Sequence, residues 1–295
     1  MSCVAAVDIG TNTVRLLVRG ADGSDLERDQ RITRLGKGVD AARALSRDSM
    51  DRTLEAVRAF VERARELGAE RIRIAGTSAL RDASNAGEFA AVVRDATGID
   101  LEVLDGRTEG RCAYRGATSR LGDGRFVVCD IGGGSTELIT SGAEVSLDVG
   151  SVRVRERLLT SDPPRDDEIE AGRAFVGDAV TGAVRSLELD GREQLVGVAG
   201  TITTLAALAA DLEVYNSDRV HGSRMTRAVV DEWASRLLSL TVEEIKKLGP
   251  VQPGRADVIG AGVLILSVVM RVLGAEDVLV SEHDILDGLA ADLLL

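Results

Sequence analysis

One structural unit occurs twice in this chain. Residues 4–18 and residues 126–139 each consist of an apolar strand that ends in aspartate, a turn of Gly, Thr, Asn or Ser, and a second apolar strand. When Asp8 is aligned with Asp130, the glycines and the hydroxyl side chains of the two turns also coincide. Because the repeat extends through strand, turn and strand, it favours a duplicated supersecondary unit over two exposed hairpins with ordinary turn residues.

The two copies differ in charge at one position. Arg15 in the first copy is replaced by Glu137 in the second. Arginine can bind phosphate oxygens in a fork, whereas a carboxylate beside phosphate is repelled unless it orders a metal ion or accepts a proton from a nucleophile. The reversal therefore favours a catalytic site over a simple binding clamp.

The turns themselves have the composition of phosphate-binding loops. A glycine-rich turn after a buried strand directs backbone N–H groups toward an anion, and an aspartate at the strand end can hold the cation that accompanies phosphates. Asp130 and, through water, Asp8 are the candidate metal ligands. The candidate phosphate-binding residues of the two loops are Gly10, Thr11, Asn12, Thr13, Arg15, Gly132, Gly133, Gly134 and Ser135.

Length and hydrophobic periodicity predict two mixed α/β domains. The chain of 295 residues exceeds one typical core. The pattern predicts a helix over residues 47–67, a strand around residues 71–74 that leads into a loop over residues 76–82, and a helix from residue 166 that three acidic residues cap. The apolar stretch 259–270 is predicted to form a buried helix, since it is shorter than the ~20 residues of a membrane span.

Composition restricts the function classes. Aromatic residues make up only 2% of the chain, which argues against stacking on single-stranded nucleic acid. The three cysteines form no Cys-x-x-Cys pair and the N-terminus has no basic region before its apolar run, so we expect a protein of the reducing cytoplasm. The two histidines lack the spacing of a zinc site.

The net charge of −12 opposes a polyanionic ligand, so attraction requires a local basic patch. Arg111 and Arg153 are the favoured members of such a patch. The full set of candidates is Arg31, Arg34, Lys37, Arg107, Arg111, Arg115, Arg153, Arg155 and Arg157.

Taken in order, these motifs resemble the exopolyphosphatase and guanosine pentaphosphate phosphohydrolase (Ppx/GppA) family, within the actin, sugar-kinase and Hsp70 (ASKHA) superfamily. The two loops resemble the first and second phosphate loops of the family. Residues 77–85 resemble the segment that carries a substrate-binding arginine, here Arg81, and residues 109–111 resemble the segment that carries the catalytic glutamate, here Glu109. Thr108 departs from the pattern, because many relatives have a second acid there. Further matches lie at residues 150–153, 197–201, 220–222 and 284–290.

The resemblance implies an α/β fold of two tandem actin-like (ribonuclease H-like) domains, residues 1–124 and 125–295, with an interdomain cleft and a last helix that returns to the first domain. It implies hydrolysis of a terminal phosphoanhydride by water, with Mg²⁺, or Mn²⁺ in its place, as cofactor. Glu109 ranks before Glu137 as the base that deprotonates this water. The implied protein is a cytoplasmic homodimer that binds neither nucleic acid nor membrane.

The identity of the substrate stays open at the level of the sequence. Inorganic polyphosphate, in short chains because of the acidic net charge, is the first candidate, and guanosine pentaphosphate (pppGpp) is the second. An ATP-dependent kinase of the same fold and a regulator that binds alarmones without catalysis are the remaining alternatives.

Overall fold

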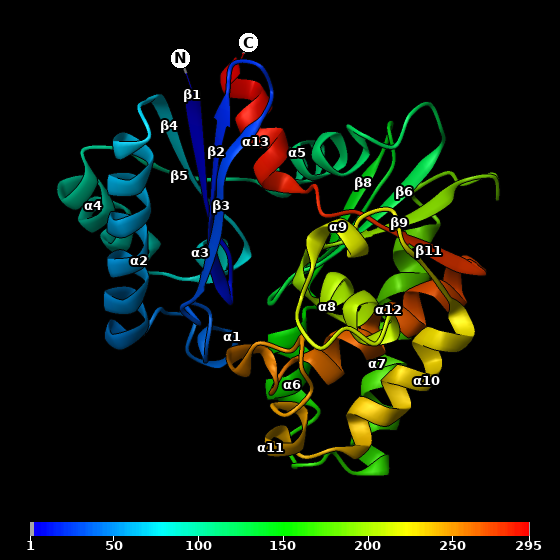
Figure 1. The fold of residues 1–295 in the computed structure, drawn as a ribbon. Coiled ribbons are helices and arrows are strands. Elements are labelled where there is room, and N and C mark those ends of the chain that lie inside the picture. Colours follow the sequence, from blue (N-terminus) through cyan, green and yellow to red (C-terminus); the bar gives the residue numbers. More distant parts are fainter. Residues whose placement is uncertain (1–2, 295) are drawn as a thin grey trace. The chain divides into compact units, whose positions relative to one another are not determined.

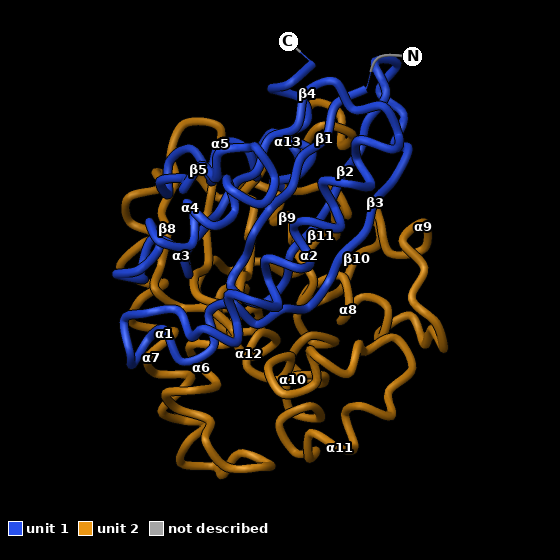
Figure 2. The backbone as a smooth tube through the Cα atoms, turned by 90° about the vertical axis from the view of Figure 1, so that its left-hand side faces the viewer, with its two compact units in different colours: residues 1–116, 285–295 blue, residues 117–284 orange. Residues whose placement is uncertain are grey.

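The computed structural model describes residues 3–294, which form two compact units (Figure 2). The first unit comprises residues 1–116 together with 285–295, and the second comprises residues 117–284. The contacts thus divide the chain at Gly116, whereas the sequence placed the division after residue 124. The first unit is therefore built from both ends of the chain.

The first unit is a five-stranded sheet with helices on both faces (Figure 1). The strand order is β3-β2-β1-β4-β5, in which β1 is antiparallel to β2 and parallel to β4. The strands are β1 (Cys3–Ile9), β2 (Thr13–Gly20), β3 (Asp25–Ile32), β4 (Ala69–Gly76) and β5 (Leu101–Val103). The helices are α1 (Val39–Ala42), α2 (Arg47–Glu66), α3 (Ser78–Asp82), α4 (Ala86–Thr97), α5 (Gly106–Thr118), whose last two residues lie in the second unit, and α13 (Ile285–Leu294).

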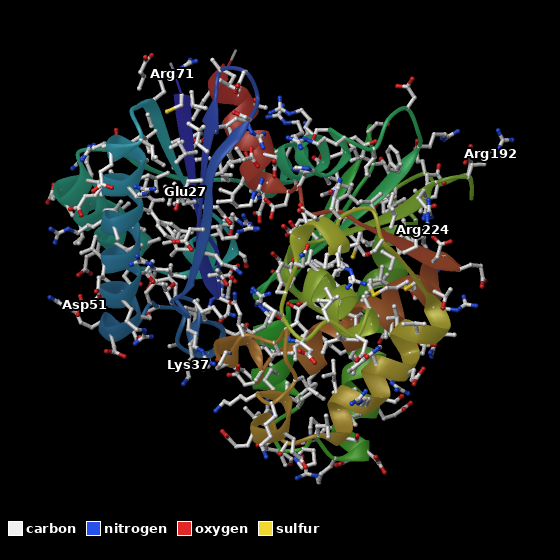
Figure 3. The ribbon with its side chains drawn as sticks, viewed as in Figure 1. Glu27, Lys37, Asp51, Arg71, Arg192 and Arg224 are labelled. Atoms are coloured by element: carbon white, nitrogen blue, oxygen red, sulfur yellow. The ribbon has the colours of Figure 1, made fainter. Side chains whose placement is uncertain are left out.

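Helix α2 and strand β4 follow the predicted patterns. The Ser46 side chain accepts a hydrogen bond from the Ser49 N–H and caps α2, whose apolar face is buried against the sheet. Glu27 on β3 pairs with Arg63 of α2 at 2.9 Å, and it lies on the side of β3 that faces this helix (Figure 3). On β4, Arg71 is exposed while Ile74 is buried, as period-two alternation predicts.

Helix α13 packs on the opposite face of the sheet from α2 and is fixed there by charge (Figure 1). The buried Asp287 carboxylate accepts hydrogen bonds from Arg19 on β2 at 2.6 Å and from Arg28 on β3 at 2.8 Å. Gly288 allows close approach to α5, because a Cβ at this position would lie 2.1 Å from the carbonyl oxygen of Cys112. The last helix thus completes the first unit through specific contacts.

The second unit repeats the sheet topology of the first. Its order, β10-β11-β9-β6-β7-β8, contains the same arrangement with β6 at the place of β1 and one additional edge strand, β10. The fold class predicted from the sequence is therefore confirmed at the level of strand order. The strands are β6 (Phe126–Ile131), β7 (Thr136–Ile139), β8 (Glu144–Leu147), β9 (Gln194–Val198), β10 (Arg224–Thr226) and β11 (Asp277–Val280).

The core of the second unit is aliphatic and is organised around α12 (Ile259–Leu273). Residues 259–270 of this helix are all buried, and α12 packs against α6, α7, α8 and α10. None of the helices in residues 3–294 combines the length and apolarity required to cross a membrane. The other helical segments are α6 (Ser151–Arg157), α7 (Asp166–Val184), α8 (Ala199–Ala209), α9 (Ser217–Val220), α10 (Arg227–Ser239), α11 (Val242–Ile245) and the 3₁₀ turn Pro253–Arg255.

Two local expectations can be compared with the structure. Glu168 caps α7 as predicted, and hydrogen bonds from the Thr160 hydroxyl and the Arg165 N–H lower its pKa to about 2. The segment expected to be a loop over residues 76–82 contains the short helix α3, which the sequence reasoning missed. Trp233 is only partly buried and packs on the edge of the core, beneath the guanidinium of Arg236.

Candidate active site

The two glycine-rich turns have the same backbone geometry. In the first, Asp8 is the strand partner of Arg15, and the Gly10 N–H donates to the Thr13 carbonyl at 3.0 Å. In the second, Asp130 is the partner of Glu137, and the Gly132 N–H donates to the Ser135 carbonyl, also at 3.0 Å. The alignment read from the sequence is thus confirmed residue by residue, including the position at which the charge is reversed.

Backbone N–H groups of the segment after β3 hold the first loop. The Thr11 carbonyl accepts from the Gly36 N–H at 2.8 Å, and the Asn12 carbonyl accepts from the N–H groups of Thr33 and Arg34, both at 3.0 Å. Because C=O and N–H point in opposite directions across a trans peptide, the N–H groups of residues 12 and 13 are directed away from this segment. Such an arrangement of N–H groups is suited to binding an anion.

The N-terminus of α6 supports the second loop in the same way. The Gly132 carbonyl accepts from the Ser151 N–H at 2.9 Å, and the Gly133 carbonyl accepts from the Val152 N–H at 2.8 Å. Gly150 permits this contact, since a Cβ there would lie 2.3 Å from the Gly133 oxygen. Residues 150–153, a motif noted in the sequence without a role, thus shape the second loop.

In the first unit, both proposed phosphate-binding arginines are paired with carboxylates. Arg15 donates to one oxygen of the buried Asp8 through Nη2 at 2.6 Å and through Nε at 3.1 Å. Arg81, at the end of α3, donates to the Leu104 carbonyl at 3.0 Å and to the Glu109 carboxylate. A phosphate that binds these arginines must compete with these carboxylates.

Glu109 lies in the first turn of α5, where Asp105 fixes the start of the helix. The Asp105 carboxylate accepts from the Thr108 N–H at 2.7 Å, which is a typical N-cap bond. Glu109 is only 8% exposed, and this burial raises the pKa of its carboxyl group, against the opposing effect of Arg81. Asp8 raises the same pKa and Arg15 lowers it, so these four charged residues form one electrostatic cluster within the first unit.

The second unit has two carboxylates at its own loop. Glu137 is buried on β7 and accepts a hydrogen bond from the Ser146 hydroxyl of β8 at 2.8 Å. Asp130 stands at the corresponding place on β6 and is partly exposed. Within residues 3–294 there is no group of three or more His, Cys, Asp or Glu side chains that could hold a metal ion.

The candidate basic residues have different surroundings. Lys37 is exposed before α1, where Figure 3 shows it, and Arg111 is exposed on α5. Arg115 is exposed too, but it pairs with Asp292 of α13. Arg153, which the sequence favoured as part of a basic patch, is buried, and its Nε donates to the Gly134 carbonyl; a place on an exposed patch is therefore wrong for it.

The two histidines form a pair in the second unit. The ring centroids of His221 and His283 lie 4.9 Å apart in an edge-to-face arrangement. The Nδ1 atom of His221 accepts a hydrogen bond from the Glu282 N–H at 3.3 Å. The structure therefore gives His221 the role of a hydrogen-bonded loop residue.

The structure combines two duplicated loops that direct N–H groups outward with arginines and a buried carboxylate beside the first loop. This combination defines a class of enzymes that act on phosphate groups. Comparison with known proteins agrees. The sequence model of the Ppx/GppA phosphatase family matches residues 16–295. The chain belongs to the Ppx/GppA phosphatase family.

Individual relatives match over nearly the whole chain. The chain is 40% identical to Exopolyphosphatase 2 of Mycobacterium tuberculosis, over 98% of both sequences. It is 30% identical to a bifunctional 3-dehydroquinate synthase/phosphatase of Fusobacterium nucleatum, of which it covers 45%.

Solved structures of relatives have the same fold. An exopolyphosphatase-like protein superposes with a TM-score of 0.92 at 32% identity and covers 99% of this chain and 98% of its own. The Ppx/GppA phosphatase of Aquifex aeolicus superposes with a TM-score of 0.83 at 31% identity, with the same coverage of both chains.

Proposed function

We propose that this protein is an exopolyphosphatase, which releases the terminal phosphate of inorganic polyphosphate by hydrolysis. The observation that carries the proposal is the Arg81–Glu109 pair, with a carboxylate of raised pKa beside a phosphate-binding arginine. The 40% identity to Exopolyphosphatase 2 of M. tuberculosis supports the choice of substrate class.

In the proposed reaction, substrate binding frees the base. Terminal phosphate oxygens take over the guanidinium groups of Arg15 and Arg81, since charge-assisted bonds to phosphate satisfy the same donors. Glu109 then loses its partner and accepts a proton from the attacking water. Its raised pKa suits this task, because a base is most effective when its pKa approaches the working pH. Positioning by the loops supplies much of the acceleration of phosphoryl transfer.

The loop carboxylates suit a magnesium ion that arrives with the substrate. Mg²⁺ is usually bound by one or two carboxylates together with phosphate oxygens and water, so a dedicated cluster of three protein ligands is not required. We assign Asp130 as the ligand, while Asp8 acts through water or through its bond to Arg15. When bound, the metal ion would neutralise charge on the phosphates; Mn²⁺ could replace it.

Short chains are the proposed substrates. The net charge of −12 repels a long polyanion. In addition, Arg153, one of the two favoured members of the basic patch, is buried. We therefore expect catalytic efficiency per chain to fall as polyphosphate lengthens. Added salt should narrow the difference by screening over about 8 Å at physiological ionic strength. Equal or better efficiency on long polymer at low salt would contradict this preference.

The experiment that tests the function measures phosphate release with Mg²⁺ from triphosphate, long polyphosphate, pppGpp and ATP. Glu109→Gln is the matched variant, because it keeps the size of the side chain and removes the proton acceptor. We expect it to lose about 100- to 10,000-fold in kcat while substrate binding is retained. Release from pppGpp in preference to all polyphosphates would replace the proposal, and near-normal turnover of the variant would move the role of base to Glu137.

A further inference from the structure

Arg153 is a buried cation whose role the proposed reaction does not explain. Its side chain is 5% exposed, and its Nε donates a hydrogen bond to the Gly134 carbonyl of the second loop at 2.8 Å. The Asp148 carboxylate lies 3.8 Å away but is 84% exposed, so it is a weak partner for a buried charge. The hydrogen bond to the Gly134 carbonyl ties this buried guanidinium to the second loop.

This contact is one of three hydrogen bonds that hold successive carbonyl groups of the second loop. The carbonyls of Gly132 and Gly133 accept from N–H groups at the start of α6, and the Gly134 carbonyl accepts from Arg153. Each bond fixes one peptide plane, so the N–H groups of residues 133, 134 and 135 are all directed away from α6. Arg153 holds the last of these planes, the one that carries the Ser135 N–H, through its bond to the Gly134 carbonyl.

The first loop provides an internal comparison. Asn12, which aligns with Gly134, has its carbonyl held by two backbone N–H groups, those of Thr33 and Arg34. In the second loop a side chain replaces this backbone support. A single substitution at residue 153 can therefore release the Gly134–Ser135 peptide of the second loop, whereas the main chain itself holds the corresponding peptide of the first.

We propose that Arg153 is a positioning residue for phosphate binding by the second loop, an inference that rests on the proposed function. It orients the Gly134–Ser135 peptide so that the Ser135 N–H faces a substrate phosphate. The chain of bonds from guanidinium to carbonyl and from N–H to phosphate is cooperative, because each bond polarises the next. Arg153 thus strengthens phosphate binding without touching the phosphate.

The test exploits the fact that Nε is the donor. A glutamine at residue 153 places its amide nitrogen the same number of bonds from the backbone as the arginine Nε, so Arg153→Gln keeps the hydrogen bond and removes the charge. Arg153→Lys keeps the charge but places a carbon at that point, and Arg153→Met removes both. Arg192→Met is the control, since this exposed arginine lies in the turn before β9, outside both loops.

We expect KM for triphosphate to rise about 10- to 100-fold in the Met and Lys variants, as for loss of a hydrogen bond to a charged group. The Gln variant should stay within about fivefold of the wild-type KM and the Arg192 control within about twofold. The dissociation constant of triphosphate with Mg²⁺, measured by calorimetry in a Glu109→Gln background, should follow the same order. If the Lys variant has a KM and a dissociation constant for triphosphate equal to or lower than those of the Gln variant, the inference is overturned. The comparison of these two variants decides the question even if the Met variant does not fold.

The inference and the proposed function can fail separately. If the wild-type protein hydrolyses polyphosphate and Arg153→Met matches it in KM, the inference is wrong and the function stands. If the wild-type protein releases no phosphate but Arg153→Met binds triphosphate more weakly, the function is wrong and the inference stands. A wild-type protein that does not bind triphosphate overturns both.

Discussion

Gly150→Ala should change the geometry of the second loop without removing any of the polar groups of that loop. The residue has φ −129°, which any amino acid adopts, so only the space around its Cα requires glycine. The added methyl would lie 2.3 Å from the Gly133 oxygen and 2.5 Å from the Gly134 carbon, about 1 Å short of ordinary contact. The loop must therefore move by about 1 Å, and a displacement of this size can cost about 100-fold in rate.

The assay compares kcat/KM for triphosphate, with thermal unfolding as a check that the variant is folded. Gly182→Ala is the matched control on α7, because its Cβ would meet nothing within 4 Å. We expect this control to keep full activity and to gain about 0.5–1 kcal/mol in the free energy of unfolding, as alanine usually does in a helix. A folded Gly150→Ala protein with kcat/KM within about threefold of wild type would refute the claim that α6 sets the loop geometry.

Three further predictions concern charged groups. Arg81→Met should shift the acidic limb of the pH profile of kcat/KM to higher pH, because Arg81 lowers the pKa of Glu109; an unchanged limb would exclude Glu109 as the titrating base. Asp287→Ala should cost about 3 kcal/mol in urea unfolding, because it removes a buried carboxylate that pairs with both Arg19 and Arg28, whereas the exposed Asp48→Ala should cost less than about 0.5 kcal/mol. Asp130→Asn should raise the Mg²⁺ concentration for half-maximal activity while the melting temperature changes little; a normal requirement would remove Asp130 from the metal site.

The sequence predicted the parts of the fold that depend on local periodicity. The pairing of Asp8 with Arg15 and of Asp130 with Glu137 follows from two alternating strands joined by a short turn, which leaves little choice of register. The start of α2 at Ser46 was predictable too, since a helix cap is a local signal.

Properties that depend on distant contacts could not be predicted from the sequence. Nothing local distinguishes Arg153, which is buried beneath the loop, from Arg157 on the same helix, which is exposed. The pair between Arg81 and Glu109 joins the ends of two helices 28 positions apart, so it exists only once α3 and α5 pack. The sequence located both residues by resemblance but could not show that they neutralise each other.

The position of α13 has a consequence for the order in which the protein can be made. The second unit is one continuous segment, whereas the first needs residues from both ends of the chain. During synthesis, β1 and β2 emerge early but cannot bury the face that α13 covers until Ile285–Leu294 have left the ribosome. Meanwhile Arg19 and Arg28 lack the carboxylate of Asp287. The unit that carries the proposed base is thus completed only after helix α13 has been added to the chain, later than the whole of the continuous second unit.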